Sequence, residues 1–346
     1  MAAQRGGTRV PTGGIVSGNS QPAAFITGVS GQDGLYLAES LLGRGYKVFG
    51  TTRDPTSAAP RLPESLRGSV RLLPWDLRDE RRLEELVRDC RPCEFYNLGA
   101  YASGAGMYDP AIDIGEINGL AVTRILDVIR GVNPQIRLCQ ASSAEIFGEP
   151  SESPQSERTA FRPRSPYGAA KLYAHYMVRI YRQRYGLFAC SAILFNHESP
   201  RRGLDFVTRK VTQGAASIKL GLAESLALGN LDARRDWGFA GDYVHAMWLM
   251  LQAPRPDEYV VASGATHSVR ELCELAFERV GLDYRKFVHE ADRAAYRPLE
   301  PVQLVGDATK LRTQLGWVPQ MGFRDLVHMM VDADVEALSD RRNRQR

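Results

Sequence analysis

A glycine-spaced turn lies between a short apolar run and a helical pattern near the start of this 346-residue chain. Residues 23–27 form the apolar run, glycines recur at every third position up to residue 34, and leucines and alanines follow at helical spacing. This order suits a dinucleotide, because glycines let the backbone approach a pyrophosphate and a helix N-terminus attracts its charge. A tight turn without a ligand is the alternative. The predicted cofactor-binding residues here are Gly28, Ser30, Gly31, Gln32, Asp33 and Gly34.

Strand-like and helix-like segments alternate over the first 195 residues. Strands are expected at 46–52, 70–75, 94–100, 136–141 and 190–195, with helical patterns between them that include a single helix over about 114–129. This alternation predicts an α/β fold with a Rossmann-type, doubly wound parallel sheet. From about residue 206 the rhythm becomes irregular, which predicts a smaller, mixed α/β substrate-binding lobe.

Four parts follow from these patterns. Residues 1–22 are rich in small and polar residues and lack an apolar segment, so we expect a flexible N-terminal extension. Residues 23–195 are expected to form mainly the dinucleotide-binding Rossmann domain. Residues 196–338 are expected to form mainly the substrate-binding lobe, interleaved with late elements of the sheet, and 339–346 a basic tail.

The ends of three strands are predicted to contact the cofactor. The second strand ends at Arg53, and an Arg there can accommodate a ribose 2′-phosphate, whereas an acidic residue would hydrogen-bond a 2′-hydroxyl. Arg53 therefore favours NADP, although Asp54 beside it favours NAD and a solvated surface Arg is the alternative. The third strand should end near the adenine, and the fourth ends in small residues that leave room for the nicotinamide ribose. The corresponding residues are Asp76, Leu77, Leu98, Gly99 and Ala100.

Tyr167 and Lys171 lie four residues apart at the start of a helical pattern. Such residues share a helix face, so a buried ammonium can lie beside the phenol and lower its pKa. Ser143 and Glu145 follow the fifth strand, at the sheet edge where open α/β folds bind ligands. Each residue alone is more often structural. Together, beside a glycine turn, they predict a catalytic site.

Charge and cysteine content exclude several classes of function. The formal net charge is +4, part of it in the last six residues, so we expect neither a nucleic-acid nor a membrane-surface partner. The five cysteines are odd in number and scattered, which favours a reducing, cytoplasmic location. Cys90 and Cys93 have redox or zinc spacing without a second ligand pair, so we expect free thiols and no metal site.

Several longer runs carry a resemblance to a known family. They are residues 27–34, 163–173, 193–203, 206–210 and 228–238. With the glycine turn and the Ser–Tyr–Lys set, these runs resemble the extended short-chain dehydrogenase/reductase superfamily and, within it, the GDP-mannose 4,6-dehydratase family. The resemblance covers roughly residues 23–338.

The resemblance implies an NADP-dependent enzyme that converts GDP-mannose to a GDP-4-keto-6-deoxy sugar and acts as a homodimer or homotetramer. Residues 23–195 would then be mainly the NADP-binding domain, and residues 196–338 mainly the GDP-sugar-binding lobe. It implies that Tyr167 takes the C4-hydroxyl proton, with Lys171 lowering its pKa and holding the cofactor ribose. Ser143 would hydrogen-bond the same oxygen. Glu145 would remove the C5 proton, after which water leaves from C6.

The resemblance also implies further binding residues. His197 and Arg202 would contact the phosphate side of the cofactor. Basic side chains neutralise a pyrophosphate, and a carboxylate can accept the donors of guanine. The residues implied for the substrate are Glu145, Asn196, Lys210, Arg235, Arg297 and Glu300.

Two places depart from the family pattern. The glycine-rich loop from Tyr101 to Tyr108, expected over the sugar, differs in residue type and is about one residue short, which leaves the sugar open. Ala144 replaces a Ser, so the departing hydroxide would take its proton from Glu145 or from a water. The alternatives are a dehydratase of another GDP-hexose or heptose, a GDP-sugar epimerase or reductase, and a non-catalytic GDP-sugar and NADP-binding protein.

Overall fold

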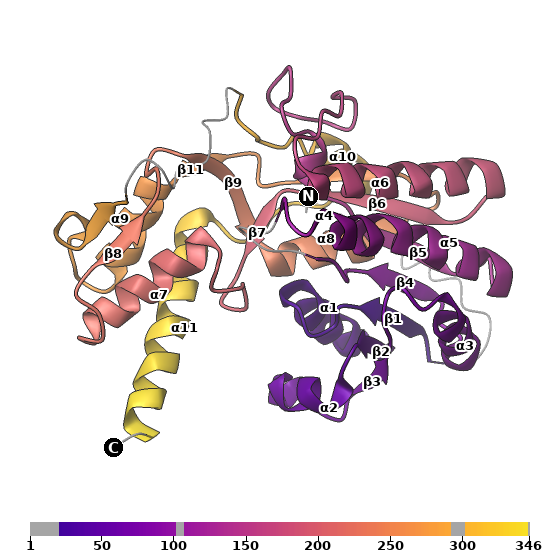
Figure 1. The fold of residues 1–346 in the computed structure, drawn as a ribbon, viewed down its shortest axis with the longest axis horizontal. Helices are drawn as coiled ribbons and strands as arrows, with labels where there is room; N and C mark the ends of the chain where they lie inside the picture. The colour runs from indigo at the N-terminus through magenta and orange to yellow at the C-terminus, as the bar shows by residue number, and fades with distance from the viewer. Residues whose placement is uncertain (1–20, 102–106, 292–301, 345–346) are drawn as a thin grey trace, which may run out of the picture.

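The computed structural model describes residues 21–101, 107–291 and 302–344. Its centre is a seven-stranded parallel sheet with the order β3-β2-β1-β4-β5-β6-β10 (Figure 1). The chain winds outward from the middle of the sheet in both directions, so the predicted Rossmann-type fold is confirmed. The strands are β1 (Ala23–Thr27), β2 (Lys47–Thr52), β3 (Val70–Pro74), β4 (Glu94–Asn97), β5 (Arg137–Ala141), β6 (Ala189–Leu194) and β10 (Glu258–Val261).

Helices cover both faces of this sheet, which explains why its strands are continuous apolar runs. On one face α1 (Gln32–Gly43), α8 (Ala240–Gln252) and α10 (Thr309–Leu315) pack around one apolar cluster. On the other face α3 (Glu80–Cys90), α5 (Ala121–Val132) and α6 (Pro166–Tyr185) enclose a second. The sheet is therefore the middle of three layers, and its strand ends are left for function.

A smaller lobe lies beside the carboxyl ends of these strands (Figure 1). It contains a three-stranded sheet, a two-stranded sheet and three helices around their own apolar cluster. These elements are β7 (Asn196–Glu198), β9 (Arg234–Phe239), β11 (Thr266–Ser268), β8 (Leu226–Leu228), β12 (Val288–Glu290), α7 (Val207–Lys219), α9 (Val269–Arg279) and α11 (Phe323–Arg344). The segment between β9 and β11 returns to the large sheet as β10.

The structure corrects the helix expected over 114–129. Helix α4 (Ala111–Gly115) leads into a π-helical stretch, η3 (Glu116–Leu120), and then into α5. Asn118 lies in this stretch, where its side chain accepts from Tyr101 N at 2.7 Å and donates to Tyr101 O at 3.0 Å. A regular helical pattern could not reveal this, because the interruption serves a contact with the loop after β4.

The remaining elements are short. They are α2 (Pro55–Ala58) and the 3₁₀ turns η1 (Ala59–Arg61), η2 (Glu64–Leu66), η4 (Ala144–Ile146) and η5 (Tyr284–Lys286). At the other end of the chain, α11 continues through the basic segment as far as Arg344. Across the described ranges, no helix has the length and apolarity to cross a membrane. Cys90 and Cys93 are free thiols, as expected.

Candidate active site

The three glycines of the turn between β1 and α1 have three different structural roles. Gly28 has a φ of +66°, and a Cβ there would lie 2.9 Å from the Gly99 backbone. A Cβ on Gly34 would lie 2.4 Å from the Gly28 carbonyl oxygen, so Gly34 allows the helix to pack against the turn. Gly31 has only one backbone atom near its Cβ position, and it is exposed with Ser30 at the helix N-terminus. That open side is where a pyrophosphate can approach.

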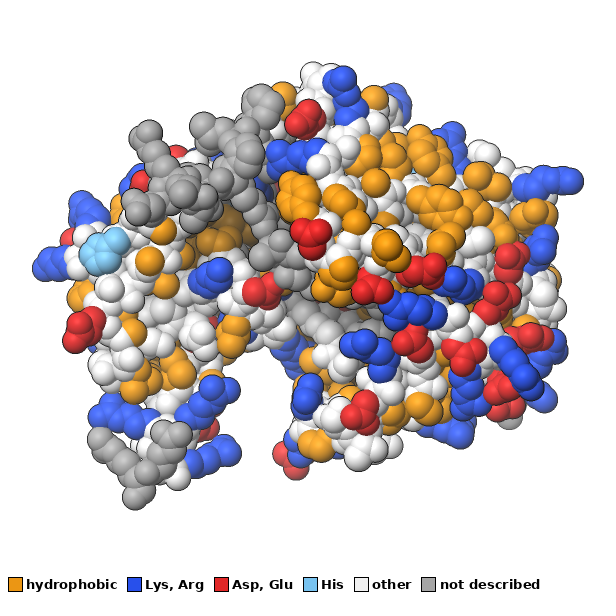
Figure 2. All heavy atoms as spheres, in the orientation of Figure 1, with side chains coloured by type: hydrophobic (Ala, Val, Ile, Leu, Met, Phe, Trp, Pro, Cys, Tyr) orange, Lys and Arg blue, Asp and Glu red, His pale blue; other side chains and the backbone are white. Residues whose placement is uncertain are grey.

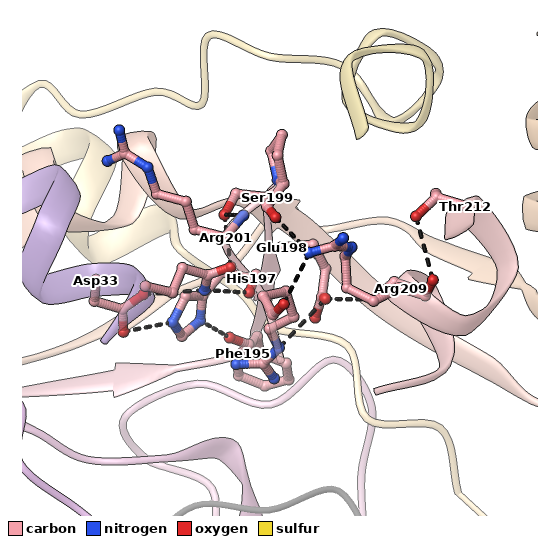
Figure 3. A network of polar contacts seen from close by, with 12 residues as sticks. Asp33, Phe195, His197, Glu198, Ser199, Arg201, Arg209 and Thr212 are labelled. Atoms are coloured by element: carbon pink, nitrogen blue, oxygen red, sulfur yellow. Dashed lines mark hydrogen bonds and ion pairs between the residues drawn. The ribbon is translucent and has the colours of Figure 1, made fainter. Parts of the chain in front are cut away.

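Helix α1 is joined to β7 by a polar network (Figure 3). His197 Nε2 lies 2.9 Å from Asp33 Oδ2, and Gln32 Nε2 donates to the His197 carbonyl at 3.0 Å. Ser199 Oγ donates to Gln32 Oε1 at 2.8 Å. Burial lowers the pKa of His197, but Asp33 outweighs it, so the pKa of His197 is raised. The sequence placed Asp33 and His197 in one cofactor site, and the structure brings them into contact.

The start of α6 fixes the predicted catalytic tyrosine. Ser165 caps the helix by accepting from Gly168 N at 3.1 Å, and Pro166 occupies the first turn, where its missing N–H does no harm. Tyr167 follows, and its own N–H donates to Met107 O at 3.2 Å. A Cβ on Gly168 would lie 2.6 Å from the Glu145 carbonyl oxygen, so glycine lets α6 approach η4 closely.

Lys171 lies one turn further along α6 with 4% of its surface exposed. Its Nζ donates to the Ala141 carbonyl at 2.9 Å and lies 5.8 Å from the centroid of the Tyr167 ring. Burial lowers the pKa of Lys171 to about 8, although the Asp33 carboxylate raises it. The ammonium is thus held at the carboxyl end of β5, close to the face of the tyrosine.

Ser143, Glu145 and Tyr167 come together at this strand end. Ser143 hydrogen-bonds the Tyr167 side chain, and its Oγ also accepts from Glu145 N at 3.2 Å. Burial raises the pKa of Tyr167 to about 12, the Ser143 contact lowers it, and Glu145 raises it. We expected Lys171 to lower the pKa of this phenol; in the protein alone, burial prevails.

The other predicted cofactor contacts lie along neighbouring strand ends. Arg53 is exposed after β2, while Asp54 caps α2 by accepting from Thr56 N at 3.0 Å and Ser57 N at 3.2 Å. Asp76 follows β3 and accepts from Arg78 N at 2.9 Å. Leu77, Leu98, Gly99 and Ala100 are partly buried at the same edge.

Three of the residues implied for the substrate lie on described elements of the smaller lobe. Asn196 begins β7, Lys210 is exposed on α7, and Arg235 lies on β9 with an Nη1 contact to Arg234 O at 2.7 Å. Arg202, which was implied for the cofactor, lies 3.6 Å from the centroid of the Phe206 ring and 3.4 Å from Glu198 Oε2. Arg297, Glu300 and residues 102–106 of the predicted sugar loop lie outside the described residues.

The sequence reasoning missed two polar groups beside these residues. Arg201 forms a bidentate pair with Glu39 of α1, with both distances 2.8 Å, and lies over the Tyr36 ring. Asn97 and Gln140 form a buried side-chain hydrogen bond of 2.6 Å between β4 and β5. For Asn97 and Gln140 the available signal was a polar residue inside an apolar strand pattern, because buried amides require hydrogen-bond partners.

The strand ends fit a nicotinamide dinucleotide. The open side of Gly31 provides backbone at a helix N-terminus for phosphates, and the close approach of Gly28 to Gly99 keeps the loops after β1 and β4 free of side-chain bulk. Ser142 is 4% exposed, and its Oγ has no hydrogen-bond partner among the described residues. An orphaned hydroxyl beside Ala141, the partner of Lys171, is consistent with a polar ligand at this place.

Comparisons with known proteins point to one family. A family described as GDP-mannose 4,6 dehydratase matches residues 25–330. The human protein named GDP-mannose 4,6 dehydratase is 43% identical over 347 residues, covering 93% of each chain. GDP-mannose 4,6 dehydratase 1 of Arabidopsis thaliana is 45% identical over 325 residues, covering 90% of each. The Vibrio cholerae protein of the same name is 39% identical over 348 residues, covering 90% of this chain and 94% of its own.

Solved structures support the fold. UDP-glucose 4-epimerase of Thermus thermophilus, in complex with NAD, is 26% identical with a TM-score of 0.77, covering 90% of this chain and 98% of its own. A dTDP-glucose 4,6-dehydratase of Bacillus anthracis is 18% identical with a TM-score of 0.80, covering 92% and 98%. The sequence matches extend over nearly the whole described fold and include the glycine turn and the Tyr167–Lys171 helix. This chain belongs to the GDP-mannose 4,6-dehydratase family.

Proposed function

We propose that this protein dehydrates GDP-mannose to GDP-4-keto-6-deoxymannose with NADP as its cofactor. The observation that carries the proposal is the arrangement of Ser143, Glu145 and Tyr167 at one strand end, where Ser143 contacts both of the others. A tyrosine beside a lysine suits oxidation of an alcohol, and a carboxylate next to it suits removal of a second proton. Relatives of 39–45% identity named for this reaction support the choice of substrate.

The first role of the chain is to take a proton from the C4 hydroxyl. Tyr167 accepts this proton, and Ser143 orients the same oxygen. Because burial raises the pKa of Tyr167 to about 12, the phenolate needs positive charge nearby, and Lys171 supplies it while it remains protonated. When bound, the nicotinamide would supply a hydride acceptor for C4 and a hydride donor for C6, and the glycine turn and Lys171 would hold the cofactor.

The second role is to move protons at C5 and C6. The C5 proton becomes acidic once C4 is a ketone, and Glu145 removes it. The C6 hydroxyl then leaves as water, with the proton that Glu145 has taken up. Ala144 cannot supply a proton and is buried in an apolar cluster with Phe195 and Ile193. As the hydride reaches C6, C5 takes up one proton, which balances the proton that Tyr167 accepted from the C4 hydroxyl. Glu145 therefore serves both carbons, and the sugar loses one water with no net oxidation.

The preference for NADP rests on Arg53 and Asp54. The Asp54 carboxylate already accepts two N–H groups at the start of α2, so it is not directed to a ribose hydroxyl. Ser57 lowers the pKa of Asp54, which keeps that cap charged. Arg53 remains exposed at the strand end and suits a 2′-phosphate. Five free cysteines suit the cytoplasm as the compartment of this reaction.

A homodimer through α4, η3 and α6 completes the proposal. Large apolar side chains are exposed on these packed elements, and Figure 2 shows hydrophobic side chains gathered over this side of the molecule. Exposed apolar patches of this kind mark interfaces, and one patch can pair with its own copy about a two-fold axis. The residues are Ile112, Leu120, Tyr173, Tyr176, Ile180 and Tyr185.

The test is to incubate the purified protein with GDP-mannose and NADP and to follow the product by mass spectrometry and by alkali-induced absorbance of a 4-keto sugar. We expect a product lighter by one water, and NADP rather than NAD in the cofactor released on denaturation. An unchanged product mass would indicate an epimerase. A gain of two hydrogens would indicate a reductase. Turnover of another GDP-sugar but not of GDP-mannose would overturn the substrate assignment. If no GDP-sugar is turned over, the proposal that the protein is an enzyme is overturned.

A further inference from the structure

A line of buried hydrogen bonds crosses the carboxyl ends of three neighbouring strands below the active site. Gly99 N donates to Thr27 Oγ1 at 2.8 Å, and Thr27 Oγ1 donates to Asn97 Oδ1 at 2.6 Å. Asn97 Nδ2 then donates to Gln140 Oε1 at 2.6 Å. Thr27 pairs with Asn97 in register between β1 and β4, and Asn97 pairs with Gln140 between β4 and β5. The sheet itself therefore brings these three side chains into line.

The line ends at the oxygen that holds the catalytic lysine. Gln140 Nε2 donates to the Ala141 carbonyl at 2.8 Å, and Lys171 Nζ donates to the same oxygen at 2.9 Å. A carbonyl oxygen has two lone pairs, so both donors can be accommodated. The polarity of this carbonyl, and the place where the ammonium lies, thus depend on Gln140 as well as on the backbone.

The direction of the line is fixed at both ends. It begins at a backbone N–H of Gly99, which can only donate, and ends at a backbone carbonyl of Ala141, which can only accept. If the Gln140 side-chain amide were flipped, its oxygen would face the Ala141 carbonyl oxygen, which is also an acceptor. Thr27, Asn97 and Gln140 are 0–1% exposed, so water cannot replace a lost partner. Aligned donors in such a setting also strengthen one another.

We propose that Asn97 and Gln140 are positioning residues that fix Lys171 through the Ala141 carbonyl. The proposal rests on the role proposed above for Lys171. Because Gly99 also touches Gly28 of the cofactor turn, the line connects that turn to the catalytic lysine. The cofactor loops and the ammonium then keep one fixed relation, which the transfer of a hydride from C4 and of a proton from its hydroxyl oxygen requires.

Other groups also act on this lysine. Tyr167 lies on its own helix, and the Asp33 carboxylate of α1 raises the pKa of Lys171. Glu145 and Arg202 act on Tyr167 with opposite signs. Gln140 is uncharged and touches none of these side chains in the described contacts, so substituting it tests the carbonyl link separately.

The first experiment uses the cofactor-free protein and needs no catalytic activity. The free energy of unfolding is measured between pH 7 and pH 11 for the parent, Gln140→Glu, Lys171→Met and the double variant. Since the pKa of Lys171 falls from 10.5 to about 8 on folding, the parent should gain stability as the pH rises through this range. The introduced carboxylate stabilises the Lys171 ammonium and so raises the pKa of Lys171 in the folded protein. The pH at which stability begins to rise should therefore increase by about one pH unit.

The double variant separates this effect from general damage. The shift should vanish when Lys171 is already Met, because no ammonium remains to respond. The proposal is overturned if the pH at which stability begins to rise is the same in Gln140→Glu as in the parent. It is also overturned if Gln140→Glu changes the stability profile equally with and without Lys171.

The second experiment measures turnover by the holoenzyme. Gln140→Met should lower kcat about tenfold and leave KM for GDP-mannose within about twofold, because the reacting groups are misaligned while sugar contacts remain. Ser191→Ala is the matched control, since it removes a buried 2.9 Å contact to His175 between α6 and β6. It should unfold more easily yet keep its kcat. Equal kcat losses in both variants would contradict the proposal. If the parent does not turn over GDP-mannose, the proposed function fails while the unfolding experiment still decides this inference.

Discussion

Lys171 shows how a functional residue can oppose the stability of its own fold. The residue is 4% exposed, and its one described hydrogen bond is to the Ala141 carbonyl, so burial removes the charge from bulk water. The unfolded chain binds a proton at Lys171 below pH 10.5, whereas the folded chain does so only below about 8. The protein is therefore more stable above the pKa of Lys171 in the unfolded chain. This extra stability is lost as the pH falls towards the pKa of Lys171 in the folded chain, and it does not return at lower pH.

Replacing Lys171 by Met should separate stability from activity. Removing the buried charge should raise the free energy of unfolding at pH 7 by up to about 3 kcal/mol and remove the rise in stability towards pH 10. The kcat should fall at least about 100-fold. Denaturant unfolding and initial rates measure the two effects. Lys219→Met, at an exposed position on α7, should change neither, and a destabilised Lys171→Met protein would contradict this account.

Glu145 should matter after the first oxidation and not before it. Glu145→Gln keeps the size of the side chain but removes its basicity, so C4 oxidation should proceed while C5 deprotonation stops. The expected result is one equivalent of reduced cofactor per active site and a kcat lowered at least about 100-fold. Stopped-flow absorbance measures the first quantity. Normal product formation by this variant would remove Glu145 from the mechanism.

Among the elements, the turn into α1 depends most on particular residues. Gly34 and Gly43 are both glycines of this helix, yet their surroundings differ. A Cβ on Gly34 would lie 2.4 Å from Gly28 O and 2.6 Å from Val29 Cα, whereas one on Gly43 would meet nothing within 4 Å. The first glycine is required by packing, and the second only lowers helix propensity.

This pair gives a matched test of the turn. Gly34→Ala should lower the free energy of unfolding by about 1–3 kcal/mol through overpacking and should weaken NADPH binding at least about tenfold. Gly43→Ala should be neutral or stabilise the protein by about 0.5–1 kcal/mol. Thermal unfolding and fluorescence titration with NADPH are the measurements. Equal changes of stability and of NADPH affinity in the two variants would show that the close approach at Gly34 is unimportant.

The elements also show what sequence can reveal. The strand at 23–27, the glycine turn and the helix carrying Tyr167 were predictable, because residue spacing alone encodes them. The π-helical stretch at 116–120 was not, because it depends on a contact of Asn118 with Tyr101 in another segment. The fold class followed from the alternation of strands and helices, which local patterns preserve.

Contacts between distant residues were harder to foresee. Asp33 and His197 are 164 positions apart. The glycine turn placed Asp33 at the cofactor, but only the resemblance to a family placed His197 there. The line from Thr27 through Asn97 to Gln140 was missed, because it becomes visible only when the order of the strands is known. The pKa of Tyr167 was also misjudged, since the degree of burial is not contained in a four-residue spacing.

At the scale of the whole molecule, the contact between α1 and β7 is one of those that join the two lobes, and an apolar face lies outside it. The face on α4, η3 and α6 is proposed to pair with a second copy. In Ile180→Glu combined with Tyr176→Glu, charges would be buried in that contact, so the protein should become monomeric while its fold is kept. Light scattering after size exclusion measures the mass. Leu222→Glu, at a 52% exposed position on the smaller lobe, should leave the dimer intact. A parent that is already monomeric would contradict the proposed dimer.

The central claim is that hydrogen leaves C4 of the sugar and returns to C6 of the same molecule. GDP-mannose carrying deuterium at C4 tests it, with one turnover of the purified protein and no added cofactor. The product should be lighter than the substrate by one water and should carry the deuterium at C6. A product of unchanged mass, or a dehydrated product without deuterium at C6, would contradict the claim.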